Sequence, residues 1–226
     1  MFHVKHDAEF DNPDIAAAAH TLFGRRVEAA ATYRDFLADA GVVRGLIGPR
    51  EVDQMWSRHV LNCAAAAEAI AADGRVVDIG SGAGLPGIPL ALARSDLRVT
   101  LVEPLLRRYE FLVEIVGMLG LDVEVVRGRA EDKEVIAAVG GTDVVTSRAV
   151  APLDRLARWS LPLLRPGGEL LAIKGSSAGE EIEKHRAALS RAGLGDLRVE
   201  SFGADTLAVA TTVVRGEYRG KPGKRR

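Results

Sequence analysis

The chain has 226 residues, enough for one sizeable domain with an appendage. Hydrophobic residues make up 47% and charged residues 27%, which is ordinary for a globular protein and argues against disorder over most of the length. The single cysteine, Cys63, excludes an internal disulfide framework. The first ten residues lack the apolar core of a secretory signal, and no apolar run reaches the length of a membrane span. We therefore expect a cytoplasmic protein.

The formal net charge of −1 is unevenly distributed. From Arg215 onward, six Lys or Arg residues accompany a single acid, Glu217, so this stretch has a net charge of +5 and the rest of the chain −6. Basic termini on an acidic chain are typical of proteins that bind phosphate-rich partners, although a solvated tail that improves solubility has the same composition. We expect residues 216–226 to form a basic, disordered tail.

Residues 1–73 show helical patterns and no strand pattern. A first helix is expected from Pro13, because Asn12 is a good N-cap and Pro suits the first helical turn, and Gly41 is a natural stop. A second helix is expected to begin near Pro49. We interpret residues 1–73 as a helical N-terminal extension.

Strands and helices alternate over residues 74–215. Strands are expected at 76–79, 99–102, 123–126, 143–146, 169–173, 197–199 and 207–214, and helices from 88, at 105–119, 152–164 and 180–192. The last two strands are separated by little more than a loop, which favours an antiparallel edge pair. Alternating strands and helices predict a Rossmann-like α/β domain with a mostly parallel sheet between helices.

The stretch VVDIGSGAGLPGIPLAL, residues 76–92, is the most informative part of the chain. A short apolar run leads into glycines at Gly80, Gly82 and Gly84, and a new apolar segment follows at once. This is the pattern of a strand, a tight turn and a helix, in which glycines allow positive φ and close approach of a ligand. In such sheets the ligand lies beyond the carboxyl ends of the strands, near the first glycine-rich loop.

Two cofactor classes use that place. Dinucleotide folds favour G-x-G-x-x-G, whereas this loop reads G-x-G-x-G with Asp78 immediately before it. An acid there would repel a pyrophosphate and suit an ammonium or sulfonium group, which favours S-adenosylmethionine. Glu103 ends the second strand, 19 residues after Gly84, where a carboxylate can accept hydrogen bonds from ribose hydroxyls. Because NAD also carries a ribose, an NAD-dependent oxidoreductase stays open as an alternative.

Several motifs together resemble the RsmG (GidB) family, whose members are S-adenosylmethionine-dependent guanine-N7 methyltransferases of 16S ribosomal RNA. They are MWSRHVLNC (55–63), VVDIGSGAGLPGIPLALA (76–93), RGRAED (127–132), DVVTSRAVAPLDRL (143–156) and SLPLLRPGGELLAIKG (160–175). Leu-Pro-Gly after the glycines and Ser-Arg-Ala are the discriminating pieces. The resemblance implies a class I S-adenosylmethionine-dependent methyltransferase fold with a mostly parallel seven-stranded sheet. The chain departs from the usual family pattern at Ala83, where many members have proline, and at RGLIGPRE (44–51).

The resemblance also places functional residues on matching positions. Gly80 and Leu85 are expected to line the cofactor, Ala130 and Glu131 to flank its adenine, and Arg148 to face the reaction site. With the residues singled out above, the expected cofactor-binding set is Asp78, Gly80, Gly82, Leu85, Glu103, Ala130, Glu131 and Arg148. Arg148 and Lys174, which ends a strand, are expected to position the target base.

Guanine N7 has an in-plane lone pair and can attack a sulfonium methyl group without losing a proton first. A general base is therefore unnecessary, and positioning and electrostatics should supply the rate. Cys63 lies on an Ala-rich segment and is interpreted as packed core. The five histidines lack metal-ligand spacing, so no metal is expected.

The expected partner is 16S rRNA in the small ribosomal subunit or its precursor, bound through phosphates by a monomer without membrane contact. The candidate RNA-binding cations are Arg58, Arg107, Arg108, Lys221, Lys224, Arg225 and Arg226. Each could equally be a solvated surface charge. A non-catalytic RNA-binding module is the second alternative.

Overall fold

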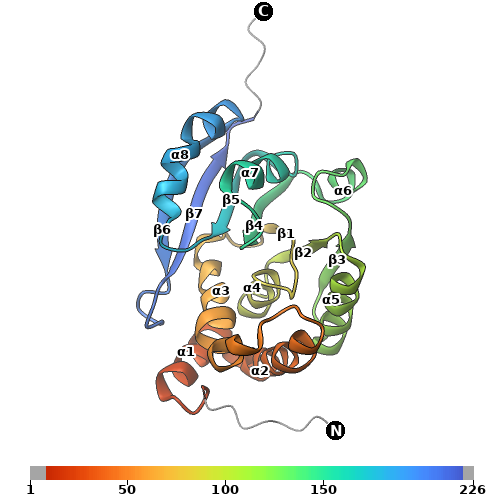
Figure 1. Ribbon diagram of the computed structural model, residues 1–226, viewed down its shortest axis with the longest axis vertical. Coiled ribbons are helices and arrows are strands. Elements are labelled where there is room, and N and C mark those ends of the chain that lie inside the picture. Colours follow the sequence, from red (N-terminus) through yellow and green to blue (C-terminus); the bar gives the residue numbers. More distant parts are fainter. Residues whose placement is uncertain (1–8, 221–226) are drawn as a thin grey trace, which may run out of the picture.

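The computed structural model describes residues 9–220, and its centre is a seven-stranded sheet of order β3-β2-β1-β4-β5-β7-β6 (Figure 1). The strands are β1 (Arg75–Ile79), β2 (Arg98–Glu103), β3 (Val123–Arg127), β4 (Thr142–Arg148), β5 (Leu164–Ile173), β6 (Leu194–Phe202) and β7 (Thr211–Tyr218). The first five pair in parallel, while β7 runs antiparallel to both β5 and β6. The antiparallel edge pair expected from the sequence is confirmed.

Helices cover both faces of this sheet. The N-terminal helices lie on one side together with the helices after β1 and β2; they are α1 (Pro13–Phe23), α2 (Val27–Phe36), α3 (Leu61–Ala65), α4 (Gly87–Ala93) and α5 (Leu106–Leu119). The opposite face is covered by α6 (Lys133–Val139), α7 (Leu153–Ser160) and α8 (Ala178–Arg191). Neighbouring residues of β1 serve different layers, because Val76 packs with the first group and Val77 with the second.

The N-terminal extension is helical, as predicted, but it is more broken than a single long helix. Gly24 adopts φ +50° at the end of α1, and a 3₁₀ turn leads into α2, so the chain bends between them. Between Pro49 and Ala69 the chain passes through 3₁₀, π and α turns around α3. Phe36 and Trp56 are buried in the same cluster as Ile88 of α4, so the extension shares one core with the sheet.

The observed elements differ from the sequence prediction in one additional helix and at the starts of two late strands. Helix α6 is not predicted by the pattern, because its seven residues are too few to show a helical period. Residues 164–168 are expected as a helix end and a turn, but they form the first part of β5. The register of the pairing between β4 and β5 shifts there, between Thr142 and Val144 of β4. Residues 207–210, expected to begin the last strand, precede β7, which starts at Thr211.

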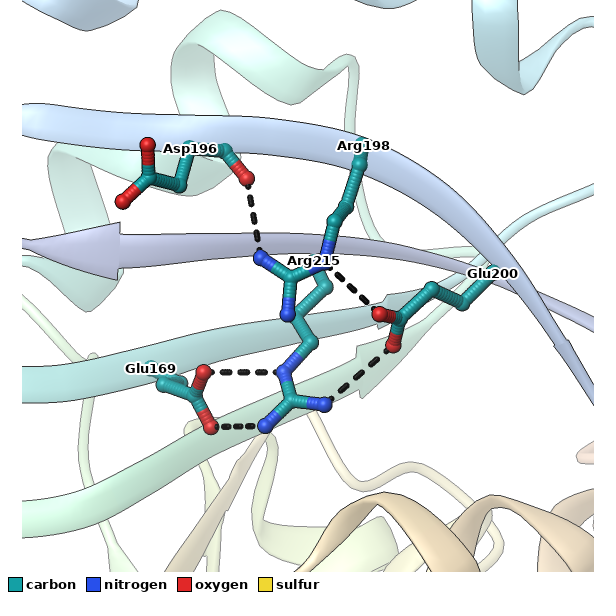
Figure 2. A network of polar contacts seen from close by, with 5 residues as sticks. All are labelled: Glu169, Asp196, Arg198, Glu200 and Arg215. Atoms are coloured by element: carbon teal, nitrogen blue, oxygen red, sulfur yellow. Dashed lines mark hydrogen bonds and ion pairs between the residues drawn. The ribbon is translucent and has the colours of Figure 1, made fainter.

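The C-terminal edge of the sheet contains cations that the composition assigns to a tail. β7 continues to Tyr218, so the expected tail boundary after residue 215 falls inside a strand. Arg215 pairs with Glu169 on β5 (2.6 and 2.8 Å) and with Glu200 on β6 (3.2 Å), which joins three strands through one guanidinium (Figure 2). Arg219 likewise lies 2.7 Å from Asp196. These two cations therefore have structural partners, and the expectation of a basic tail rests on residues 221–226, which lie outside the described part.

At Gly87, its first residue, α4 lies close against β1 and β2. A Cβ added there would overlap the side chain of Leu101 and lie 2.9 Å from Oδ2 of Asp78. Gly87→Ala is therefore expected to lower the free energy of unfolding by about 2–4 kcal/mol. Urea denaturation measures this value.

Gly117 supplies the matched control, because it lies on the exposed side of α5 with open space around the added Cβ. Gly117→Ala should raise the free energy of unfolding by about 0.5–1 kcal/mol, since alanine is the better helix former. Similar effects of the two substitutions would contradict the close approach at Gly87.

Candidate active site

A cavity of about 540 Å³ opens beyond the carboxyl ends of β1 to β4. It lies where the strand order reverses, between β1 and β4, which is the usual ligand site of an open parallel sheet. Of the residues expected to bind the cofactor or the base, those lining the cavity are Gly80, Gly82, Leu85, Glu103, Ala130, Glu131 and Arg148. The volume lies within the range of small-molecule sites.

The glycine loop forms the floor of this cavity. Gly80 and Gly82 have φ of +65° and +59°, as expected of a turn that only glycine adopts easily. From the N-terminal layer, the buried hydroxyl of Tyr33 donates a hydrogen bond of 2.9 Å to the carbonyl oxygen of Ala83. The loop conformation is thus fixed by a residue 50 positions earlier in the chain.

Glu103 holds the loop from the second strand. Its Oε2 accepts a hydrogen bond from the amide of Gly82 and its Oε1 one from the amide of Leu105, both at 3.0 Å. The residue is 1% exposed yet contributes to the cavity wall. A carboxylate oxygen accepts more than one hydrogen bond, so this fixed group keeps acceptor capacity for a ligand's hydroxyl groups.

Asp78 lies beneath the loop and is not among the residues that line the cavity. Its Oδ2 accepts a hydrogen bond of 3.0 Å from the amide of Gly87, while Oδ1 is buried without a hydrogen-bond partner among the described residues. Burial raises the pKa of this carboxyl to about 7, against the opposing effect of the Gly87 amide. The sequence argument that its charge selects the ligand is therefore weakened, and its observed role is to hold the start of α4.

Arg148 ends β4 and points toward the N-terminal layer. Its Nη2 lies 2.7 Å from Nδ1 of His59 and 3.2 Å from the carbonyl oxygen of Arg58, and its Nη1 lies 3.4 Å from Sγ of Cys63. Within residues 9–220 no carboxylate forms an ion pair with this guanidinium. The guanidinium of Arg148 is therefore a positive charge that a ligand can approach, and its hydrogen-bond partners, which hold it in place, are uncharged.

His59 is neutral at physiological pH. Burial, followed by the positive charge of Arg148, lowers its pKa to about 4. Because a guanidinium only donates hydrogen bonds, Nδ1 is the acceptor and the ring proton sits on Nε2. That nitrogen lies 2.7 Å from Oε2 of Glu51, but its N–H is not aligned with the oxygen for a hydrogen bond, so the imidazole stands between Arg148 and a carboxylate at the cavity wall without joining them.

Lys174 does not line the cavity. Its Nζ lies 2.9 Å from the carbonyl oxygen of Ala151 and 3.0 Å from Oε2 of Glu181 on α8. Glu181 also accepts a hydrogen bond from the amide of Leu153. Lys174 and Glu181 together hold the loop between Arg148 and α7. The observed contacts of Lys174 are therefore structural, and none of them places it beside the target base.

Of the remaining sequence-predicted cations, Lys221, Lys224, Arg225 and Arg226 lie outside the described residues. Arg108 lines the cavity, whereas Arg58 and Arg107 are exposed outside its wall. Cys63 is fully buried, and burial raises the pKa of its thiol, which confirms its interpretation as packed core. The described part of the chain contains no group of three or more His, Cys, Asp or Glu side chains arranged to hold a metal ion. None of the described helices is long and apolar enough to cross a membrane.

One wall of the cavity is formed by residues that the sequence does not predict to lie there. Leu46, Ile47, Glu51 and His59 reach it from the N-terminal layer, and Trp159 reaches it from α7. His59 stands in the MWSRHVLNC motif, which could have indicated a role. Glu51 lies in the stretch that departs from the family pattern, so only the structure brings it to the site.

The strand order and the cavity at the reversal point together define a class I S-adenosylmethionine-dependent methyltransferase fold. M. jannaschii TYW2, solved in complex with AdoMet, superimposes with a TM-score of 0.55 over 72% of this chain and 77% of that chain, at 22% identity. P. horikoshii TYW2, solved in complex with MeSAdo, gives a TM-score of 0.54 over 72% of this chain and 63% of that chain, at 15% identity.

The chain belongs to the GidB family, described as rRNA small subunit methyltransferase G, whose model matches residues 26–209. The ribosomal RNA small subunit methyltransferase G of Rhodococcus jostii is 57% identical over 100% of both chains. The protein of the same name from Mycolicibacterium smegmatis is 59% identical over 94% of this chain and 91% of its own length. The family resemblance stated from the motifs is confirmed.

The raised pKa of Asp78 predicts a pH-dependent stability. In the unfolded chain the carboxyl loses its proton near pH 4, whereas the folded protein retains it up to about pH 7. The folded state then binds more protons between these values, so its stability should fall as pH rises through this window.

Asp78→Asn cannot ionise and should remove this contribution while keeping an acceptor for the Gly87 amide. Urea denaturation at several pH values from about 4 to 8 should show the wild-type free energy of unfolding declining relative to that of the variant. A difference that stays constant with pH would contradict the prediction.

Proposed function

We propose that this protein transfers a methyl group from S-adenosylmethionine to N7 of a guanine in the 16S rRNA of the small ribosomal subunit. The observation that carries the proposal is the cavity at the end of β1 and β4, in a chain that belongs to the GidB family and matches curated rRNA methyltransferases over its whole length. Family membership speaks against an NAD-dependent oxidoreductase.

The residues present suit the cofactor. The loop from Gly80 to Leu85 offers close backbone approach, Glu103 offers a fixed carboxylate for ribose hydroxyls, and Ala130 and Glu131 line the side expected for the adenine. S-adenosylmethionine supplies an electrophilic methyl group on a sulfonium.

Arg148 stands on the other side of the reversal point, where the target base would enter. Its guanidinium, without a carboxylate partner among residues 9–220, suits a hydrogen bond to the O6 atom of guanine, next to N7. The N7 lone pair reacts without loss of a proton, so the chain's task is to orient the base and exclude water. Burial and the charge of Arg148 lower the pKa of His59 to about 4, which makes this imidazole a weak base, in keeping with a reaction that needs none.

The proposal is tested with rRNA from cells that lack this protein. Incubation of the purified protein with labelled S-adenosylmethionine and small subunits from those cells should produce N7-methylguanine, and cells that contain the protein should already carry it. Arg148→Ala should lower kcat by about 10²-fold, the usual cost of removing an oriented donor from an active site. Binding of rRNA without methyl transfer would instead indicate an RNA-binding module.

The basic residues 221–226 are proposed to bind rRNA phosphates. Removing them should weaken rRNA binding and flatten its dependence on salt, because each lost phosphate contact reduces the slope of log K against log salt by about 0.7–0.9. Filter binding at several salt concentrations measures the slope. Cofactor affinity should stay unchanged, and an unaltered slope in the truncated protein would contradict this role.

A further inference from the structure

We propose that Glu51 recognises the target base, its carboxylate accepting hydrogen bonds from N1–H and N2–H of guanine while Arg148 donates to O6. The inference rests on the proposed function and names the residue that makes that site selective for guanine.

Glu51 is placed at the target side of the cavity. It belongs to the 3₁₀ turn Pro49–Gln54 of the N-terminal layer, lines the cavity, and has a side chain that is 41% exposed. Gly48 leaves room for its carboxylate, since a Cβ there would lie 3.2 Å from Oε1. Only the His59 ring separates this carboxylate from the guanidinium of Arg148.

His59 lies between this carboxylate and Arg148. With Nδ1 occupied by the guanidinium of Arg148, Nε2 carries the ring proton and lies 2.7 Å from Oε2 of Glu51, without the alignment of a hydrogen bond. Oε1 and the remaining lone pairs of the carboxylate are then available to a ligand in the cavity. A donor and an acceptor are therefore displayed on either side of a single imidazole ring.

This pair matches the edge of one base. Guanine presents an acceptor, O6, beside two donors, N1–H and N2–H, whereas adenine presents a donor, N6–H, beside an acceptor, N1. A guanidinium next to a carboxylate satisfies all three guanine groups and opposes both adenine groups. The same contacts leave N7 of guanine free to react.

The reaction strengthens the contact. Methylation at N7 transfers the positive charge of the sulfonium to the purine, which makes N1–H and N2–H better hydrogen-bond donors. A carboxylate on that edge therefore stabilises the transition state more than the bound substrate, which raises kcat.

The other carboxylates of the cavity are less suited to this task. Glu103 is 1% exposed and is held against the cofactor loop at the end of β2, where it is expected to meet the ribose hydroxyls. Glu131 is exposed at the end expected for the adenine, after β3. Glu51 is the acid that shares the Arg148 side of the cavity.

The test combines an enzyme variant with a base analogue. Small-subunit rRNA is assembled with guanosine or with inosine, which lacks the N2 amine, at the methylated position, and methyl transfer is measured for wild type, Glu51→Gln and Asp53→Asn. Asp53 is an exposed acid on the same turn outside the cavity wall, so Asp53→Asn is the matched control. Isothermal titration of S-adenosylhomocysteine and a thermal melt accompany each variant.

We expect wild type and Asp53→Asn to prefer guanosine over inosine by about tenfold or more in kcat/KM, in the range of one good base contact. Glu51→Gln should lose about 10- to 100-fold with guanosine, mainly in kcat, and discriminate less than about threefold between the two substrates. Its cofactor affinity and melting temperature should equal those of wild type.

Two results would overturn the inference while leaving the proposed function intact. One is a Glu51→Gln variant that keeps the full preference for guanosine. The effect of removing the carboxylate and the effect of removing the N2 amine would then be independent of each other, so the two groups would not be in contact. The other is a parallel loss of cofactor affinity, which would place Glu51 on the ammonium group of S-adenosylmethionine. Absence of transfer by wild type to the guanosine substrate would overturn the proposed function itself.

Discussion

The site depends on how tightly the glycine loop is held at the end of β1. Three hydrogen bonds reach it from separate elements: Tyr33 of α2 to the Ala83 carbonyl, Glu103 of β2 to the Gly82 amide, and Asp78 of β1 to the Gly87 amide. Buried hydrogen bonds of this kind are costly to leave unmade, so each contact requires the others to keep the loop in place. The cavity floor is therefore held in place by contacts within the protein itself.

Parts of the sequence with a strong local signal predicted their structure well. The loop at Gly80 and Gly82, the acid at the end of β2 and the late antiparallel pair follow from glycine conformation, chain spacing and short connections. Helix α6 could not be predicted, because seven residues do not show a helical period. The start of β7 was misplaced because the apolar residues 207–210 resemble a strand in composition.

The cavity-lining residues that the sequence does not predict are those brought to the cavity by tertiary contacts. Glu51 lies almost a hundred residues before Arg148, which the family resemblance does identify, and only folding brings the two to the sides of His59. Asp78 and Lys174 show the reverse situation, in which the sequence predicts a ligand contact and the structure shows supporting contacts. The charge of Asp78 beside the glycine loop and the place of Lys174 at a strand end predict ligand contact, whereas Asp78 is buried beneath the loop and Lys174 donates a hydrogen bond to Ala151 in the structure.

The shared core of the N-terminal layer and the sheet has a consequence for dynamics. Thr211 of β7 donates a hydrogen bond of 2.6 Å to the carbonyl oxygen of Asn62, and Arg26 donates one of 2.8 Å to the carbonyl of Ala91. If this layer detached locally, the sheet would remain but the cavity would lose one wall. Any ligand that touches both the loop and Glu51 must oppose that opening by mass action. Occupancy of the site and closure of the N-terminal layer are thus thermodynamically linked, and a saturated enzyme should exchange the amide protons of α3 more slowly than a free one.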